Sequence, residues 1–439
     1  MIIDNNADIV DNIREIYRIA PSNKVRDLIS KHFIPTQDEK KHNAEIPTPV
    51  QLVDEMLNTI PTEFWKTPQK VFEPCCGKGN FVLGILDRFY KGLEEMYPDK
   101  IERCRVIMTE CIYYADLTAL NVFITTEIMK CHVQNYCGLD ELDYEFNNNV
   151  GDTLVLNIKD KWNINGFDAV IGNPPYNDDS GNKGKGHTLW TVFIEKSLKI
   201  WLSLNGYLLF VSPSLWRQSD HPLQNLMKSK QIIYLEIHDE KDGLKTFKCN
   251  TRYDIYLIQN NSYEIDTIIK TQKREIIHVN LTEWKFIPNF KFVELKQMID
   301  NTKEKINILY SRSDYASDKK WTKKEKTDIY KYPVVYSINR KNEPRFIWSE
   351  IKTKEGHYGF PKVIFGSGAT GFMIDKEGKY ACSEFCTGII DEVENLENIA
   401  NILNSPNFKE IILATSVSKA EINRKILKHF KKDFWKEFI

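Results

Sequence analysis

Two hydrophobic periodicities alternate along the first two thirds of the chain. Short apolar runs bounded by turn residues predict strands, and stretches with apolar residues three and four positions apart predict helices. This alternation predicts an α/β fold with a doubly wound, mostly parallel sheet. One antiparallel strand is expected near the sheet edge, because no helix is predicted between the last two strands. The predicted strands are 70–73, 105–110, 147–151, 166–172, 207–213, 231–237 and 252–259, and the predicted helices are 50–60, 81–90, 113–129 and 189–202.

The pattern differs at both ends of this region. Residues 1–40 carry apolar residues at helical spacing and predict an amphipathic segment that flanks the main domain. From about residue 285 the sequence becomes irregular, aromatic and rich in lysine. We therefore expect an N-terminal helical segment (1–45), an α/β domain (46–284) and a mixed α+β domain (285–439). The polar, glycine-rich stretch 178–187 is predicted to be a mobile loop.

Composition is that of a globular protein, and it excludes several classes. The 439 residues allow two or three domains, with 42% hydrophobic and 28% charged residues. No run of 18 apolar residues and no apolar signal core occur, so we expect no membrane partner and a location inside the cell, in the cytoplasm. The nine cysteines include no pair of CxxC arms, so we expect reduced thiols and no metal site.

Charge is distributed unevenly along a chain whose net charge is only −1. Residues 285–439 hold 28 Lys and Arg against 21 Asp and Glu, whereas residues 1–284 hold 32 against 40. A basic C-terminal part suits contact with phosphates, although a solvated lysine-rich surface explains it equally well.

The most informative motif is Asn173-Pro174-Pro175-Tyr176, directly after the predicted strand 166–172. Two prolines forbid the strand from continuing, so the chain turns where open α/β sheets bind ligands. The Asn oxygen and the carbonyl before Pro175 can both accept hydrogen bonds from one amino group, and the Tyr ring can stack on a planar substrate. Taken alone, the motif fits an ordinary strand-ending turn equally well.

A second motif is the glycine-rich turn Glu73-Pro-Cys-Cys76-Gly77-Lys-Gly79 between a predicted strand and a predicted helix. Glycines let the chain approach a ligand, and the helix N-terminus offers free N–H groups. The spacing matches neither a P-loop nor GxGxxG. Glu110 ends the next predicted strand, at the offset where an acid holds ribose hydroxyls. Together these features favour a cofactor that contains adenosine but no pyrophosphate.

In this order, the motifs from Pro47 to about Leu257 resemble those of the γ-class N6-adenine-specific DNA methyltransferases. The resemblance implies a class I methyltransferase fold, S-adenosylmethionine as cofactor and a target-recognition domain at 285–439. It also implies a role for each matched position. The implied cofactor-binding residues are Thr48, Glu73, Cys76, Gly77, Gly79, Phe81, Glu110 (ribose) and Asp152 (adenine amino group). The implied catalytic residues are Asn173, Pro174, Pro175 and Tyr176, with Tyr176 and Phe247 stacking on the target base.

The resemblance implies methyl transfer to N6 of an adenine flipped out of double-stranded DNA. Restriction–modification or viral self-protection is the expected setting, with a cognate restriction endonuclease as a partner. One departure is Cys75, where the family has Ala or Ser. Three alternatives stay open: an RNA N6-adenine methyltransferase, a protein glutamine-N5 methyltransferase and a catalytically silent DNA-binding protein of the same fold.

Overall fold

The computed structural model describes residues 2–20, 24–33, 46–177, 188–299, 304–352, 357–366, 371–417 and 423–438. The predicted loop 178–187 lies outside these residues. The chain divides into two compact units. Unit 1 comprises Met1–Ser214 and Asn225–Thr282, and unit 2 comprises Leu215–Gln224 and Glu283–Ile439.

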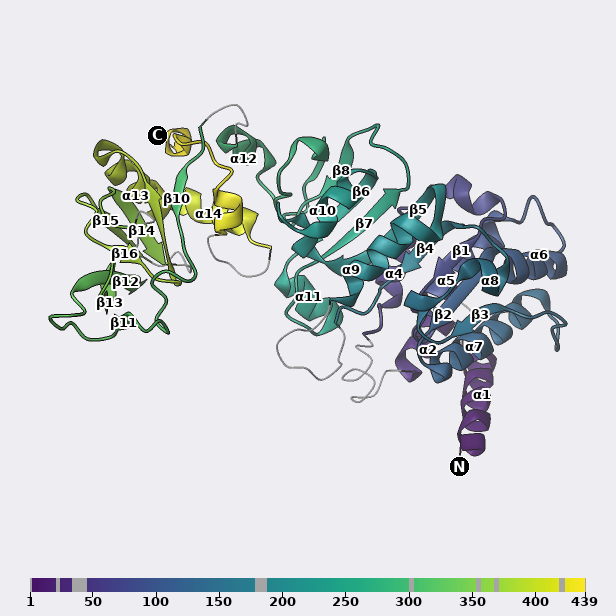
Figure 1. Ribbon diagram of the computed structural model, residues 1–439. Coiled ribbons are helices and arrows are strands. Elements are labelled where there is room, and N and C mark those ends of the chain that lie inside the picture. Colours follow the sequence, from purple (N-terminus) through teal and green to yellow (C-terminus); the bar gives the residue numbers. More distant parts are fainter. Residues whose placement is uncertain are drawn as a thin grey trace. The chain divides into compact units, whose positions relative to one another are not determined.

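Unit 1 is built on one nine-stranded sheet with the order β3-β2-β1-β4-β5-β7-β6-β8-β9 (Figure 1). Strands β3, β2, β1, β4 and β5 are parallel, as the sequence predicts, and β7 runs antiparallel to both β5 and β6. The strands are β1 Val71–Glu73, β2 Ile112–Asp116, β3 Asn147–Val150, β4 Phe167–Gly172, β5 Leu202–Pro213, β6 Gln231–His238, β7 Tyr253–Gln259, β8 Thr267–Lys270 and β9 Ile276–Val279.

Helices cover both faces of this sheet, because the central strands are apolar on both faces. On one face Ala169 and Ile171 of β4 join a core with α4, α5 and α7. On the other face Phe72 stacks on Phe167, with ring centroids 4.7 Å apart, and meets Trp201 edge-on. The helices of the described part of unit 1 are α1 Ile2–Ile19, α2 Val25–His32, α4 Val50–Leu57, α5 Asn80–Gly92, α6 Lys100–Val106, α7 Ala119–Cys137, α8 Ile158–Trp162, α9 Leu189–Lys196 and α11 Glu240–Phe247; α10 Pro222–Lys228 begins in unit 2.

The predicted strand 105–110 is wrong. This stretch is helical, with α6 followed by a π-helical turn, Ile107–Cys111, and the strand β2 begins only at Ile112. The Asp99 carboxylate caps α6 by accepting from the Glu102 N–H, and this local bond starts a helix where apolar content alone predicts a strand. Consequently the helix predicted from residue 113 begins at Ala119.

The antiparallel strand is confirmed, but its predicted setting is wrong. It lies inside the sheet, between β5 and β6, rather than at the edge. A helix, α11, also connects it to β6, and Asp239 caps that helix by accepting from the Lys241 and Asp242 N–H groups.

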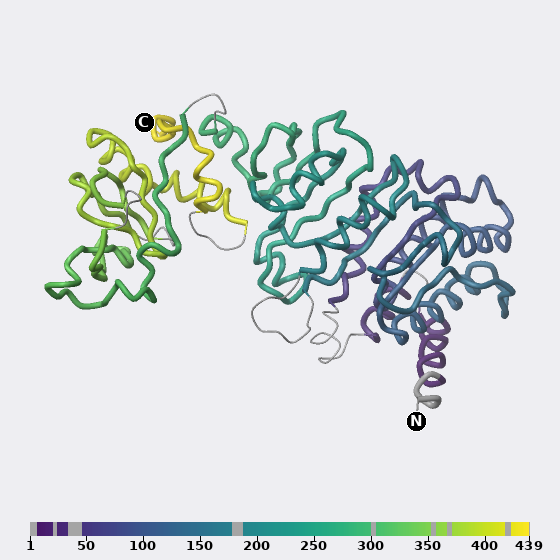
Figure 2. Tube along the Cα trace, viewed as in Figure 1, coloured from purple at the N-terminus to yellow at the C-terminus, as the bar shows by residue number. Residues whose placement is uncertain are grey.

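The N-terminal helices belong to unit 1 and pack against its core. Ile13 and Ile29 are fully buried in its core. The Tyr17 hydroxyl lies 2.8 Å from Nδ1 of His132 on α7, and Figure 2 shows the two helices side by side.

Unit 2 contains two four-stranded sheets, β10-β17-β14-β15 and β11-β13-β12-β16. The buried Arg217 guanidinium attaches the segment 215–224 to this unit by donating to the Ile287 carbonyl at 3.0 Å and to Oδ1 of Asn289 at 2.9 Å. The elements are β10 Asn307–Leu309, β11 Thr322–Lys323, β12 Tyr332–Ile338, β13 Pro344–Ser349, β14 Lys362–Gly366, β15 Phe372–Asp375, β16 Ala381–Cys382, β17 Cys386–Ile390, α12 Phe292–Met298, α13 Leu396–Asn404, α14 Pro406–Thr415 and α15 Arg424–Leu427. In the described parts of both units, no helix combines the length and apolar character needed to cross a bilayer.

We predict that Ile13→Ala destabilises unit 1, because the fully buried side chain leaves a cavity between α1 and the core. The expected loss in the free energy of unfolding is about 2–5 kcal/mol, measured by chemical denaturation. Ile19→Ala, at a position 64% exposed on the same helix, is the matched control and should change stability by less than about 0.5 kcal/mol. Equal effects of the two substitutions would show that α1 does not belong to the core.

Candidate functional site

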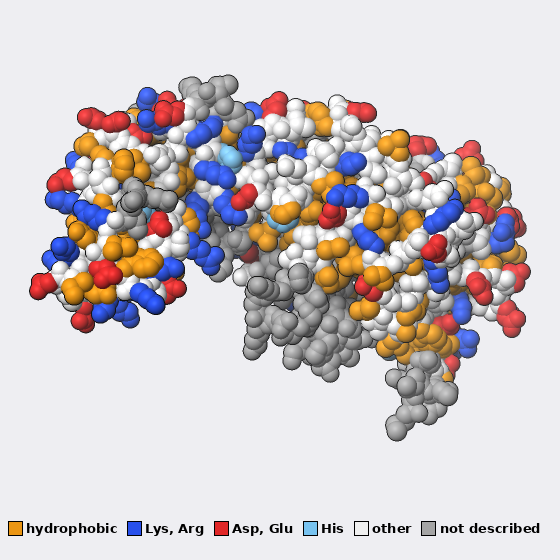
Figure 3. Space-filling view, in the orientation of Figure 1, with side chains coloured by type: hydrophobic (Ala, Val, Ile, Leu, Met, Phe, Trp, Pro, Cys, Tyr) orange, Lys and Arg blue, Asp and Glu red, His pale blue; other side chains and the backbone are white. Residues whose placement is uncertain are grey.

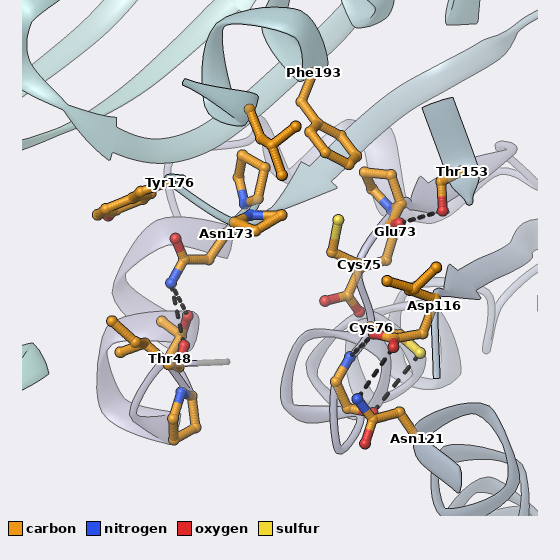
Figure 4. Close-up of a pocket in the computed structure, with 18 of the residues that line it drawn as sticks. Thr48, Glu73, Cys75, Cys76, Asp116, Asn121, Thr153, Asn173, Tyr176 and Phe193 are labelled. Carbon is orange, nitrogen blue, oxygen red and sulfur yellow. Dashed lines mark hydrogen bonds between the residues drawn. The ribbon is translucent and has the colours of Figure 1, made fainter. Parts of the chain in front are cut away.

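A cavity of about 610 Å³ opens at the C-terminal edge of the unit 1 sheet (Figure 4). The turns that follow β1, β3 and β4 line it, together with the end of β2, the start of α9 and the end of α11. Of the predicted site residues, those that line it are Thr48, Glu73, Cys76, Gly77, Phe81, Asp152, Asn173, Pro174, Pro175, Tyr176 and Phe247.

Gly79 lies beneath the cavity and shapes the turn after β1. It adopts a left-handed conformation with φ of 85° at the N-cap of α5, and a Cβ here would lie 3.1 Å from Cγ2 of Thr125. Thr125 also donates from Oγ1 to the Gly77 carbonyl at 3.0 Å. Gly79 therefore permits the close packing that holds the turn, and it does not line the wall.

The acid at the end of β2 is Asp116. The prediction for Glu110 assumed that this residue ends the second strand, and that assumption is wrong. Glu110 is exposed in the π-helical turn before β2, at the opposite end of that strand, and does not line the cavity. The four strand steps from Ile112 to Asp116 alone span roughly 13 Å, so Glu110 and Asp116 lie at opposite ends of β2. The signal in the sequence is the run Ile112–Asp116, four apolar residues that end in a carboxylate.

Asp116 is held firmly by its neighbours. One oxygen accepts from the Gly77 N–H at 3.0 Å, and the other accepts from the Thr118 N–H at 2.9 Å and from Nδ2 of Asn121 at 3.1 Å. The carboxylate thus joins the turn after β1 to the start of α7. Neither Asp116 nor Asn121 was predicted from the sequence as a site residue.

Glu73 is a buried acid in the wall of the same cavity, with 2% of its surface exposed. Its Oε2 atom has no hydrogen-bond partner within the described structure. Burial, and secondly the neighbouring Asp116, raise the pKa of Glu73 well above its usual range. Burial and Asp116 likewise raise the pKa of the Cys75 and Cys76 thiols, so both stay protonated. Two acids close together here favour a ligand that carries positive charge or donates hydrogen bonds.

Asn173 lies on the other side of the cavity, and its amide orientation is set by hydrogen bonds. Nδ2 donates to Oγ1 of Thr48 at 3.2 Å and to the Ile46 carbonyl at 3.4 Å. Oδ1 is buried and has no partner among the described residues, and Figure 4 shows it on the side away from Thr48. Asn80 donates to the Thr48 carbonyl at 2.8 Å. Thr48 therefore forms hydrogen bonds with both Asn173 and Asn80. Oδ1 of Asn173 is therefore available to accept a hydrogen bond from an N–H group of a ligand.

Two aromatic rings stand near this acceptor. Tyr176 has a buried hydroxyl without a partner in the described structure, and burial raises its pKa well above the ordinary value. Phe247 is 7% exposed and packs edge-on against Tyr253, with ring centroids 5.0 Å apart. Both residues line the cavity, so a flat molecule at Asn173 would have rings available for stacking. Sequence reasoning missed further lining residues, namely Thr153, Phe193, Cys249 and Thr251.

One segment of the chain matches a known family model. Residues 110–247 match the family model described as Eco57I restriction-modification methylase. This segment begins before β2 and ends with α11, so it contains the Asn173 turn and Asp116 but not the turn after β1.

Two relatives are similar in sequence. The first is described as an uncharacterized adenine-specific methylase of Mycoplasma pneumoniae (strain ATCC 29342 / M129 / Subtype 1); it is 24% identical over 302 residues, covering 52% of this chain and 70% of the relative. The second is modification methylase CviBIII of Paramecium bursaria Chlorella virus NC1A, 24% identical over 241 residues and covering 52% of each chain. The chain thus spans only about half the length of the second relative.

Among solved structures, a nuclease-deletion mutant of the Type ISP restriction-modification enzyme LlaGI, in complex with a DNA substrate mimic, has a similar fold. The TM-score is 0.52 at 11% identity, covering 88% of this chain and 46% of that one. The comparisons confirm the resemblance to adenine-specific methyltransferases and the class I methyltransferase fold that the motifs predict. The match to a methylase family model implies a methyl donor as cosubstrate.

We predict that Glu73→Gln stabilises the ligand-free protein at neutral and alkaline pH. Because the folded-state pKa of Glu73 is raised, its contribution to stability is fully present at low pH and is lost as the pH rises through the folded-state pKa. The amide of the variant cannot ionise, so the free energy of unfolding should no longer fall at high pH. The expected gain is about 1–3 kcal/mol, the cost of a buried group without a hydrogen-bond partner. Thermal unfolding at pH 5 and pH 8 should show the gain at pH 8 only, and Glu110→Gln should show none at either pH. A lower melting temperature of Glu73→Gln at pH 8 would contradict this account.

Proposed function

We propose that this chain transfers a methyl group from S-adenosylmethionine to N6 of adenine in double-stranded DNA. The observation that carries the proposal is the buried Oδ1 atom of Asn173, which has no partner among the described residues and shares one cavity with Glu73 and Asp116. The family match and the relatives described as adenine-specific and modification methylases support the same reaction.

The residues around the turn after β1 fit S-adenosylmethionine. This cofactor carries a positively charged sulfonium and an ammonium group, and the unpartnered Glu73 oxygen and the Asp116 carboxylate lie in the wall where such charges would be stabilised. When bound, it supplies an electrophilic methyl group. We assign its binding to Thr48, Glu73, Cys76, Gly77, Phe81, Asp116 and Asp152.

The acceptor side fits a planar amine. The amino nitrogen of adenine is a poor nucleophile because its lone pair is delocalised into the ring. Hydrogen bonds from its two N–H groups to Oδ1 of Asn173 and to the Pro174 carbonyl would favour a pyramidal nitrogen with an available lone pair. Tyr176 and Phe247 would hold the ring, and positioning would supply much of the rate enhancement. Adenine within a duplex cannot reach this cavity, so we infer that the base is flipped out.

Unit 2 favours DNA over the alternative acceptors. A glutamine-N5 methyltransferase needs the same amine-binding turn but no second unit of this size, and we assign unit 2 to target recognition. RNA remains the second candidate, because the cavity itself recognises a planar amine and not a sugar. We place the activity inside the cell that holds the DNA, in modification or self-protection, with a restriction endonuclease as a functional partner.

We predict that label from S-adenosylmethionine appears in duplex DNA as N6-methyladenine, and that Asn173→Ala lowers kcat by about 100-fold or more. Binding of S-adenosylmethionine to the variant should change by less than about threefold, because the substituted amide serves the acceptor. Asn401→Ala, an exposed position on α13, is the matched control and should keep full activity. Label in RNA, or in the glutamine of an offered protein, would replace DNA as the substrate. Cofactor binding without any acceptor would instead indicate a silent protein of this fold.

A further prediction separates the two acids that flank β2. Asp116→Asn should raise the Kd for S-adenosylmethionine about 10- to 100-fold, because a charged hydrogen-bond acceptor in the cavity is lost. Glu110→Gln should leave the Kd within about twofold, since Glu110 lies outside the cavity. Titration calorimetry measures both values. A larger rise in Kd for Glu110→Gln than for Asp116→Asn would support Glu110 as the cofactor-binding acid.

A further inference from the structure

Residues 319–352 of unit 2 are a basic stretch that does not line the cavity. They hold ten Lys and Arg against four Asp and Glu. The stretch includes β11, the edge strand of the sheet β11-β13-β12-β16, and the turn from β11 to β12. Figure 3 shows Lys and Arg side chains over the part of unit 2 that contains β11 and β13.

Five of the eight lysines of this stretch lie over aromatic rings. The ammonium group of Lys323 is 4.7 Å from the centre of the Tyr330 ring, and that of Lys326 is 5.1 Å from the Trp348 ring. Similar pairs are Lys319 over Trp321 at 6.0 Å, Lys331 over Tyr332 at 5.5 Å, and Lys352 over Tyr332 at 5.1 Å and Tyr358 at 5.2 Å. We call the set Lys319, Lys323, Lys326, Lys331 and Lys352 the lysine–aromatic edge.

Several of the rings are themselves fixed through their polar ends. The Trp321 indole N–H donates to the Asp314 carbonyl at 2.8 Å. The Tyr330 hydroxyl donates to the Lys320 carbonyl at 3.2 Å, and the Tyr358 hydroxyl donates to the Pro333 carbonyl at 3.2 Å. An anchored ring restricts the lysine above it, so less side-chain entropy remains to be lost when an anion binds.

The same lysines form no ion pair with the acidic side chains that the structure describes. Within the described residues, no carboxylate lies within ion-pair distance of any lysine of this edge. Three other lysines of unit 2 are paired: Lys376 lies 2.8 Å from Glu397, Lys379 lies 2.8 Å from Glu377, and Lys296 lies 2.6 Å from Glu283. Within the described part of unit 2, no ion pair therefore compensates the positive charge of the edge.

We propose that the lysine–aromatic edge binds backbone phosphates of duplex DNA and supplies affinity that does not depend on base sequence. Each ammonium group covers one face of its ring, so these lysines act as positioned point charges for phosphates, and they are not a platform for bases. The inference rests on the proposed function, because it takes DNA as the ligand.

The test measures duplex DNA affinity against salt concentration for the full chain. The triple variant Lys323→Gln, Lys326→Gln, Lys352→Gln removes three exposed charges. We expect the slope of log Kobs against log salt to fall by about 2–3, and Kd at moderate salt to rise roughly 10- to 100-fold. Lys296→Gln, Lys376→Gln, Lys379→Gln is the matched control with the same charge change; its lysines are already paired, so the slope should change by less than about 1.

Each result decides the inference. The triple Lys→Arg variant at the three test positions keeps the charge and should restore the slope, which separates a lost contact from a folding defect. Equal slopes for the test and control variants would show that the lysine–aromatic edge does not bind phosphates. Methyl transfer to DNA would not be affected by that result. Normal salt-dependent binding without methylation would instead overturn the proposed reaction and leave the edge standing. Tighter, slope-sensitive binding of RNA than of duplex DNA would overturn DNA as the ligand.

Discussion

The pairing of β1 with β4 is the interaction on which the site depends. Val71 pairs with Ala169 and Phe72 with Val170, and the Phe72 ring is buried against Phe167. Because the two strands are parallel, both end at the same edge of the sheet. From this pair the chain order proceeds outwards in opposite directions, through β2 and β3 on one side and β5 on the other. The turns after β1 and β4 therefore diverge, and a crevice must remain between them.

The walls of this crevice are unfavourable for the protein alone. Glu73 is buried with an unpartnered oxygen beside a second acid, and Asn173 presents a buried oxygen that no described group satisfies. Each such group costs about 1–3 kcal/mol relative to a satisfied one. Apolar packing on both faces of the sheet must outweigh this cost. Stability and ligand binding thus make opposite demands on the same residues, which is typical of functional sites.

Much of the fold and site could be predicted because their signals are local. Each central strand is a short apolar run, and the Asn173 turn is marked by two consecutive prolines. The failures arose where a helix cap or a nonlocal contact decides. Two apolar runs compete near Glu110, and pairing with β1 and β3 selects the second as β2. Gly243 disfavours a helix in the sequence, yet it lies within α11. A Cβ here would lie 2.1 Å from the Thr251 carbonyl oxygen, so this nonlocal contact requires the glycine. In unit 2, strands of two to seven residues carry too short a pattern to be recognised.

Electrostatics explains why one chain would combine these two surfaces. With Glu73, Asp116 and Asp152 in its walls, the cavity would favour a cationic ligand over a phosphate. At physiological ionic strength such repulsion is screened over about 8 Å, so it acts on phosphates close to the cavity and not on distant ones. A neutral base can enter the cavity although the phosphates of the nucleic acid are repelled from it. The phosphates therefore need positively charged side chains outside the cavity. In our proposal, the lysines held over rings in unit 2, for which the described residues show no ion pair, provide such charge. A cationic cofactor and a polyanion would then be bound by different groups of side chains within a single chain.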